Sequence, residues 1–340
     1  MMIRTAFKFG IFLATLLGYA PAQTNASGVD QITLHTATTL VIVPALVQTP
    51  AKDLVFSLTA DDFALTDNGV PQKVALEADA TRPLSMVVLM QTGGAARGQF
   101  QNYVNLETML AAILGSPPNR ASIVNFDSRP EAASPFTSNI AQWSDAINHP
   151  DTGDSGAAIF DSLSFALDLL KQEPASNRRV ILLISQQHDS GSKTALKDVI
   201  RALGETNTAV YSLTFSAEKT AFKQAFKDPP HLNPPIAGAG QAYFNLSEPL
   251  GLVLGAMRKN LSAEIAALSG GESSSFDTRV QLDEDLGVLA NHVRNSYILS
   301  FYPTSKKAGL HTLHVGLVHH PDLLVTARTS YWLPDLRTDR

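Results

Sequence analysis

The stretch PLSMVVLMQTGGAARGQ, residues 83–99, decides the fold. An apolar run, Met86–Met90, breaks abruptly into a loop of small residues at Gly93 and Gly94. A run that short, bounded by Pro83 and by glycine, is typical of a parallel strand buried on both faces. The loop after such a strand lies at the carboxyl end of the sheet, where folds of this class place functional groups.

Strand-like and helix-like segments alternate downstream of this strand. Further strands are predicted at 121–126, 180–184 and 209–215, each a short apolar run. Apolar residues at helical spacing predict helices between them, over 103–114, 140–147, 159–170 and 195–203, and then over 249–268 and 282–293. We expect the polar residues Thr137-Ser138-Asn139 to cap one helix and Gly204 to stop another. This alternation predicts a doubly wound α/β domain with a mainly parallel sheet.

The two ends of the chain read as β structure. Near the amino end, 38–47 is strand-like, with Pro44 indicating an edge strand or a bulge. Asn68-Gly69 between 63–66 and 73–76 is a hairpin signal. The carboxyl end contributes runs at 297–302, 310–318 and 323–331. The economical arrangement pairs both ends into one sandwich-like subdomain, with the α/β domain inserted between them.

The amino terminus resembles an export signal. Arg4 and Lys8 precede an apolar stretch, and Ala20-Pro21-Ala22 has the small-x-small pattern that signal peptidase recognises. We expect cleavage after Ala22 and a periplasmic or secreted protein; a retained anchor is the alternative. The expected organisation is a signal peptide (1–22), a linker (23–34), an amino-terminal β segment (35–80), the α/β domain (81–294), a carboxyl-terminal β segment (295–333) and a tail (334–340).

Composition excludes several classes of function. The net charge is −5 and no cluster of Lys or Arg stands out, so we expect neither nucleic acid nor an anionic membrane as a partner. No stretch after the signal is suited to span a membrane. The chain has no cysteine, which excludes disulfides, zinc-thiolate sites and thiol nucleophiles.

Several segments together resemble a known family. They are DDFALTDNGVPQKV (61–74), RPLSMVVLM (82–90), VILLISQQHDSGS (180–192) and NSYILSFYPTSKKAGLHTLHVGL (295–317). They are similar to the von Willebrand factor type A (vWA) domain, and in particular to the acidobacterial-type VWFA-related family of exported proteins. The resemblance implies a doubly wound fold used for non-covalent binding, often through a divalent cation.

The metal motif of that family does not carry over. The first strand normally ends in D-x-S-x-S, and the corresponding positions are Gln91, Gly93 and Ala95. The metal-binding Thr position is Ala157, and the Asp after the fourth strand is Gln186. Mg²⁺ and Ca²⁺ require anionic oxygen ligands, so we expect no metal and no other cofactor. A metal-dependent adhesion module is a weaker alternative, and its rebuilt site would use Thr92, Asp154 or Asp189 as substitute ligands.

Other chemistry-bearing groups have structural interpretations. Gly153-Asp154-Ser155-Gly156 matches the surroundings of a serine protease nucleophile, but nothing predicts the double β-barrel that such a site needs. His311, His314 and His319-His320 could suggest a metal cluster, although solvated imidazoles are the expected state. Structural roles are favoured for two acidic runs, Asp61-Asp62 before a strand and Asp283-Glu284-Asp285 in the first turn of a helix.

Three functions remain open. The first is a metal-free binding module that contacts a protein or peptide partner through the sheet-top loops. The contact residues would be Gln91, Thr92, Gly93, Gly94, Ala95, Ser155, Gly156, Ala157, Gln186 and Gln187. The second is a structural component of the cell envelope that docks through an edge of the β subdomain. Enzymatic activity is the weakest alternative, and we predict that the protein is not an enzyme.

Overall fold

The computed structural model describes residues 40–77, 82–150, 152–216 and 261–335. All of them belong to one compact unit, Thr38–Arg340. The expected export signal and linker, the Pro-rich segment 227–240, the helix start at Pro249 and the last five residues lie outside the described ranges. Within those ranges, no helix combines the length and the apolar character that crossing a bilayer requires.

A six-stranded sheet forms the centre of the α/β domain, in the order β10-β9-β8-β5-β6-β7. Its strands are β5 (Leu84–Gln91), β6 (Arg120–Phe126), β7 (Pro130–Ala132), β8 (Arg178–Gln186), β9 (Ala209–Phe215) and β10 (Ser273–Ser275). Every neighbouring pair is parallel except β6 and β7. All residues of β5 are buried, as its continuous apolar run predicts. The predicted doubly wound fold is confirmed.

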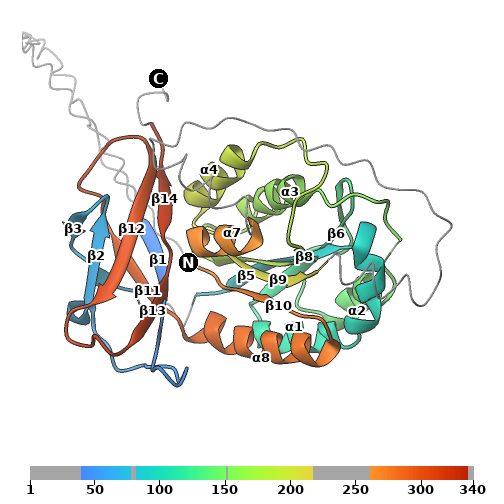
Figure 1. The fold of residues 1–340 in the computed structure, drawn as a ribbon, viewed down its shortest axis with the longest axis horizontal. Helices are drawn as coiled ribbons and strands as arrows, with labels where there is room; N and C mark the ends of the chain where they lie inside the picture. Colours follow the sequence, from blue (N-terminus) through green and yellow to red (C-terminus); the bar gives the residue numbers. More distant parts are fainter. Residues whose placement is uncertain (1–39, 78–81, 151, 217–260, 336–340) are drawn as a thin grey trace, which may run out of the picture. The chain divides into compact units, whose positions relative to one another are not determined.

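Helices cover both faces of this sheet (Figure 1). One face packs on α3 (Ile159–Lys171), α4 (Leu196–Thr206) and α7 (Leu261–Ser269), and the other on α1 (Leu106–Leu114), α2 (Ile140–Asn148) and α8 (Arg279–Asn295). The loop after β5 continues into a 3-10 helix, η3 (Gly94–Asn102), which the sequence did not predict. The Asn139 side chain accepts the Ala141 N–H at 3.0 Å, which confirms the predicted cap of α2.

Two helix boundaries differ from the prediction. Gly204 does not stop α4, which continues to Thr206 and ends at the left-handed Asn207. A Cβ at Gly204 would lie 2.5 Å from the Cβ of Trp332, so this glycine permits close packing rather than a turn. The last helix begins at Arg279, so its acidic run lies beyond the first turn, where the helix dipole is weak.

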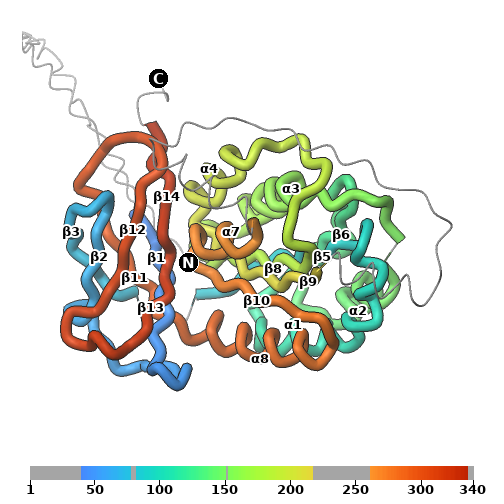
Figure 2. The backbone as a smooth tube through the Cα atoms, viewed as in Figure 1, coloured from blue at the N-terminus to red at the C-terminus, as the bar shows by residue number. Residues whose placement is uncertain are grey.

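Eight further strands form two antiparallel sheets that enclose a separate apolar core. One sheet has the order β13-β1-β11-β4 and the other β14-β12-β2-β3. The strands are β1 (Val41–Gln48), β2 (Phe63–Asp67), β3 (Val70–Gln72), β4 (Ala75–Leu76), β11 (Tyr297–Phe301), β12 (Gly309–Leu317), β13 (Leu324–Ala327) and β14 (Ser330–Leu333), and the short 3-10 helix η1 (Ala60–Asp62) precedes β2. Figure 2 shows the blue amino-terminal strands lying among the orange and red carboxyl-terminal ones. The predicted sandwich-like subdomain built from both chain ends is confirmed.

The hairpin between β2 and β3 follows the predicted turn. Asn68 and Gly69 have φ values of 48° and 81°, the positive values that a type I′ turn requires. Beyond Gln72 the chain leaves this hairpin, and β4 pairs with β11 in the opposite sheet. The second arm of the hairpin is therefore shorter than the sequence suggests.

The prediction that Pro44 marks an edge strand or a bulge is wrong. β1 lies between β13 and β11, and Pro44 is in register with Ile298 of β11. The ladder between β1 and β13 starts only at Ala45, so an imino nitrogen at Pro44 interrupts no bond to β13. The predicted single strand over 323–331 is likewise two strands, β13 and β14, which belong to opposite sheets.

Arg328, between β13 and β14, joins the sandwich to α4. Its buried guanidinium donates to Asn207 Oδ1 at 2.9 Å and to the carbonyls of Leu203 and Gly204 at 3.4 Å. Its Nε donates to the Ser330 carbonyl at 2.6 Å. Burial lowers the pKa of Arg328 to about 10. The guanidinium thus supplies donors to carbonyls at the end of a helix, where positive charge is favourable.

Candidate functional site

Four loops meet at the carboxyl end of the parallel strands. They follow β5 (91–95), β6 (127–129) and β8 (186–192), and the fourth precedes α3 (153–158). β5 lies between β6 and β8, so the chain crosses over to opposite sides from this strand. Ligands of doubly wound folds bind at such a switch point.

A hydrogen-bonded pair of glutamines, the buried Gln91 and the half-buried Gln186, closes the centre of this edge. The Gln91 side chain accepts the Gln186 backbone N–H at 2.8 Å, and its amide nitrogen donates to Gln186 Oε1 at 3.2 Å and to the Gly93 carbonyl at 3.0 Å. The Gln186 amide nitrogen donates to the His188 carbonyl at 2.9 Å. Both hydrogens of the Gln91 amide are used within the protein, so this side chain ties the end of β5 to the end of β8.

Glycines bring three of the loops into van der Waals contact. A Cβ at Gly93 would lie 2.4 Å from the Gly156 carbonyl oxygen and 2.7 Å from the Asp127 Cβ. A Cβ at Gly156 would lie 2.6 Å from the Ser128 Cα. Because any side chain at these positions would overlap a neighbouring loop, the space that a serine ligand at position 93 would occupy is filled by backbone.

Asp154 organises the rim of the same edge. Its Oδ1 accepts backbone N–H groups from Ser128 at 3.1 Å and from Gly156 at 2.7 Å, and its Oδ2 accepts the Ser128 hydroxyl. The Ser128 hydroxyl and the Gly156 N–H lower the pKa of this exposed carboxyl. Asp127 in turn accepts the Asp154 N–H at 3.0 Å. These bonds hold the loop after β6 against the loop before α3.

Asp189 caps a helix. Its Oδ1 accepts the Phe160 N–H at 3.1 Å and the Ser192 hydroxyl at 2.6 Å. Ala157 and Ser190 pair through two backbone bonds of 3.1 and 2.9 Å. Asp189 therefore satisfies one free N–H group in the first turn of α3, and Ser192, which it holds, accepts the Asp161 N–H at 3.2 Å.

These residues do not fit a hard divalent cation. Gln91 directs amide hydrogens to neighbouring carbonyls, and the Thr92 hydroxyl is buried and donates to the Phe126 carbonyl at 3.3 Å. Asp154 and Asp189 bind different loops. Within the described ranges, no group of three or more His, Asp or Glu side chains converges as a metal site would require. The arrangement instead forms a closed surface fixed by hydrogen bonds.

The predicted contact residues differ in exposure. Gln91, Thr92, Gly93 and Ala157 are buried, whereas Gly94, Ala95, Gly156, Gln186 and Gln187 are half-buried and Ser155 is exposed. The buried members support the loops and cannot touch a partner directly. Sequence reasoning missed Asp127, Ser128 and Arg129, which follow β6 at the same edge. Their position after a predicted parallel strand is the signal that could have found them.

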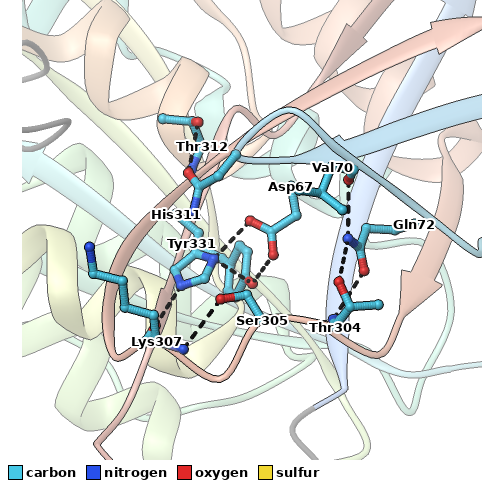
Figure 3. A network of polar contacts seen from close by, with 10 residues as sticks. Asp67, Val70, Gln72, Thr304, Ser305, Lys307, His311, Thr312 and Tyr331 are labelled. Carbon is cyan, nitrogen blue, oxygen red and sulfur yellow. Dashed lines mark hydrogen bonds and ion pairs between the residues drawn. The ribbon is translucent and has the colours of Figure 1, made fainter.

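The expectation that the histidines are solvated is wrong for His311, which is 2% exposed. In the network of Figure 3, its Nδ1 lies 2.7 Å from Asp67 Oδ1 and its Nε2 lies 2.6 Å from the Lys307 carbonyl. The Tyr331 hydroxyl is 2.8 Å from Asp67 Oδ2. His314, on the opposite face of β12, is exposed. This network lies in the core of the sandwich and is no metal cluster.

A known protein family matches the part of the chain that contains the central strands and their loops. The family description of the von Willebrand factor type A domain matches residues 86–189, from β5 to the loop after β8. This segment is therefore similar to a vWA domain. The match includes the degenerate positions Gln91, Gly93, Ala95, Ala157 and Gln186. The finer resemblance to the acidobacterial-type family rests on the sequence motifs alone.

Solved structures with similar folds share little sequence with this chain. An aerotolerance-related membrane protein from Bacteroides fragilis is 13% identical with a TM-score of 0.40, and covers 61% of this chain and 98% of its own. BatB from Bacteroides thetaiotaomicron is 12% identical with a TM-score of 0.38, and the match covers 61% of this chain and 99% of BatB. The SpRpn10 VWA domain is 16% identical with a TM-score of 0.32, and the match covers 42% of this chain and 82% of that domain. No curated protein matches the chain.

Proposed function

We propose that this protein is an exported binding module that holds a protein or peptide partner at the sheet-top loops without a metal ion. The closed edge around Gln91 and Gln186 is the observation that carries the proposal. It replaces a cation site with a rigid polar surface. Loops held by a rigid scaffold are where such folds carry binding. We assign no catalytic activity, since the vWA-type domain is an interaction module.

The rim offers the groups that a partner could contact. Ser155 and Asp154 are exposed, and Arg97 lies beside them and donates to the Gly153 carbonyl. Hydroxyl, carboxylate and guanidinium groups on backbone of defined geometry can pair with polar groups of a partner. Because Gln91 and Gly93 are buried, their contribution is to keep this rim in position.

The absence of cysteine allows a direct test by site-specific cross-linking. A Ser155→Cys variant and a Ser305→Cys variant each carry one thiol at an exposed serine, the first at the sheet top and the second on the sandwich. With a short thiol-reactive photo-cross-linker in envelope extracts, we expect a defined adduct from the Ser155→Cys variant and none from the Ser305→Cys variant. The reverse pattern would refute binding at the sheet top.

A second candidate function, docking through the sandwich, is favoured by its edge strands. Val70 of β3, Leu76 of β4 and Leu324 of β13 are 53%, 39% and 44% exposed, and each lies on a strand at the edge of its sheet. Such edges can accept a strand from another protein. In the same experiment, an adduct restricted to the Ser305→Cys variant would support this function.

Export is part of the proposal. It rests on the charged and apolar residues before Ala20-Pro21-Ala22. We expect amino-terminal sequencing of the protein recovered from the periplasm or the medium to begin at Gln23. Recovery there with Met1 intact would contradict cleavage.

A further inference from the structure

A polar hollow lies beside the closed edge, where β6 and β7 meet the loop before α3. Its volume is about 320 Å³. Its lining consists of Thr92, Asn125, Phe126, Asp127, Arg129, Glu131, Ala132, Ala133, Thr152 and Gly153. It includes neither Gln91 nor Gln186, and it borders the inherited cation position through Thr92. Its volume is at the lower end of the range for ligand pockets.

Asn125 contributes an unused amide to this hollow. It lies on β6 opposite Glu131 of β7. Its Oδ1 is buried and has no hydrogen-bond partner, and no described residue bonds its amide nitrogen. A buried polar atom without a partner is unfavourable unless a ligand or water satisfies it. A side-chain amide offers one acceptor beside a donor, which is the pairing pattern of a peptide group.

The charged groups of the hollow favour a cation. The Asp127 carboxylate already accepts hydrogen bonds from within the protein, from the N–H groups of Arg129 at 3.1 Å and Asp154 at 3.0 Å. Glu131 is exposed, and no ion pair or hydrogen bond involves its carboxylate within the described ranges. The lining thus carries two carboxylates against one guanidinium, Arg129, and one of those carboxylates is available.

We propose that this hollow binds an extended peptide segment of the partner that carries a lysine or arginine. Asn125 pairs with a backbone amide of that segment, and Glu131 accepts a hydrogen bond from its basic side chain. The inference rests on the proposed function, because it assigns the chemistry of a partner held at the sheet top. It also places the bound peptide at one end of the sheet edge, between β6, β7 and Gly153.

The test uses the full chain, immobilised, and a library of soluble heptapeptides in which each pool has one fixed central residue. We expect pools with central Lys or Arg to be retained above those with Gln or Glu. Glu131→Gln should weaken retention of the basic pools about tenfold, the loss of one charge-assisted hydrogen bond, and leave the Gln pool unchanged. Glu284→Gln, on an exposed turn of α8, is the matched control and should change nothing.

Asn125→Leu should weaken every pool, because it removes the contact to the peptide backbone. In the wild-type protein, the side-chain NH₂ resonances of Asn125 should shift on addition of a retained peptide. Equal retention of Lys and Glu pools, no retention of any pool, or unchanged binding by Glu131→Gln would each overturn the inference. If the Ser155→Cys variant still cross-links its partner while Glu131→Gln and Asn125→Leu leave the yield unchanged, the inference fails and the proposed function stands.

Discussion

His311 has a hydrogen-bond partner at each of its ring nitrogens. The Lys307 carbonyl can only accept, so Nε2 carries a hydrogen. The Tyr331 hydroxyl donates to Asp67 Oδ2 at 2.8 Å, and Nδ1 lies 2.7 Å from Asp67 Oδ1 and 3.0 Å from the Tyr331 hydroxyl. The three side chains therefore form one buried hydrogen-bond network in the core of the sandwich. This network links β2, β12 and β14.

Removing one member of this network should be costly. His311→Phe leaves the Asp67 carboxyl group buried with one fewer hydrogen-bond partner, and we expect the free energy of unfolding to fall by about 1–3 kcal/mol. His314→Ala, at an exposed position on the same strand, should change it by less than about 0.5 kcal/mol. Urea titration followed by circular dichroism measures both. Equal effects for the two variants would show that the network contributes nothing to stability.

Two buried tyrosines differ in whether the hydroxyl group has a hydrogen-bond partner. The Tyr103 hydroxyl has no partner among the described residues, whereas the Tyr331 hydroxyl bonds Asp67. Tyr103→Phe should leave stability at neutral pH unchanged or raise it by about 1 kcal/mol, because it removes an unsatisfied group. Tyr331→Phe should lower it by about 1–3 kcal/mol. A loss in the first variant as large as in the second would reveal a partner for Tyr103.

Burial raises the pKa of Tyr103, and burial with the Asp67 contact raises that of Tyr331. A raised folded pKa means that stability is complete below the unfolded value, about 10, and falls as pH rises above it, since only the unfolded chain then loses the proton. The free energy of unfolding should therefore drop as the pH rises from about 10 to about 11. Tyr103→Phe should reduce that drop by about 1.4 kcal/mol, the contribution of one tyrosine. An identical drop in wild type and variant would contradict the assignment.

At this scale the sequence predicts local chemistry and misses distant partners. Asn68-Gly69 specifies its turn through its own backbone preference. The burial of His311 depends on Asp67, which is 244 residues away in the chain. The sequence pattern of β12 gives no sign of that partner. The sequence alone therefore predicts a solvated imidazole at His311.

Among the elements, α4 and α8 each contain an interior glycine in a different setting. Gly204 of α4 lies against Trp332 of β14, with no room for a Cβ, whereas a Cβ at Gly287 of α8 would meet nothing within 4 Å. Alanine is the better helix former by about 1 kcal/mol. The same substitution should therefore have opposite effects at the two positions.

Gly287→Ala should raise the melting temperature, because the helix gains propensity without a clash. Gly204→Ala should lower it, because the new methyl group must push the backbone of Trp332 and the nearby Arg328 contacts away from α4. Differential scanning calorimetry on the two variants measures this contrast. Stabilisation by both would show that β14 does not pack tightly on α4.

The same comparison explains which elements sequence could predict. β5, β8 and β9 are continuous apolar runs, and their burial follows from composition alone. Gly204 and Pro44 were misread, because each is accommodated by a neighbour from another part of the chain. A glycine placed for close packing and a glycine placed for a helix end have the same sequence signature.

In the whole molecule, a sandwich made from both chain ends adjoins an α/β domain that is similar to vWA domains and whose sheet-top edge is closed. The sequence predicts the loss of the metal ligands once the resemblance to vWA domains is recognised, at positions Gln91, Gly93, Ala95, Ala157 and Gln186. The sequence does not predict that the edge is closed, because the closure depends on the contacts of Gly93 and Gly156 with the loop after β6. The hollow beside Asn125 depends on the same contacts.

We propose that this edge works without a cation. A ligand that binds only the folded state adds RT ln(1 + [L]/Kd), about 2.7 kcal/mol at a hundredfold excess over Kd, so a functional site must raise the melting temperature. We predict the same melting temperature in excess EDTA and in millimolar Mg²⁺, Mn²⁺ or Ca²⁺. A reproducible rise with one of these ions, abolished by Asp154→Ala or Asp189→Ala, would contradict the claim and show that the chain has rebuilt a metal site.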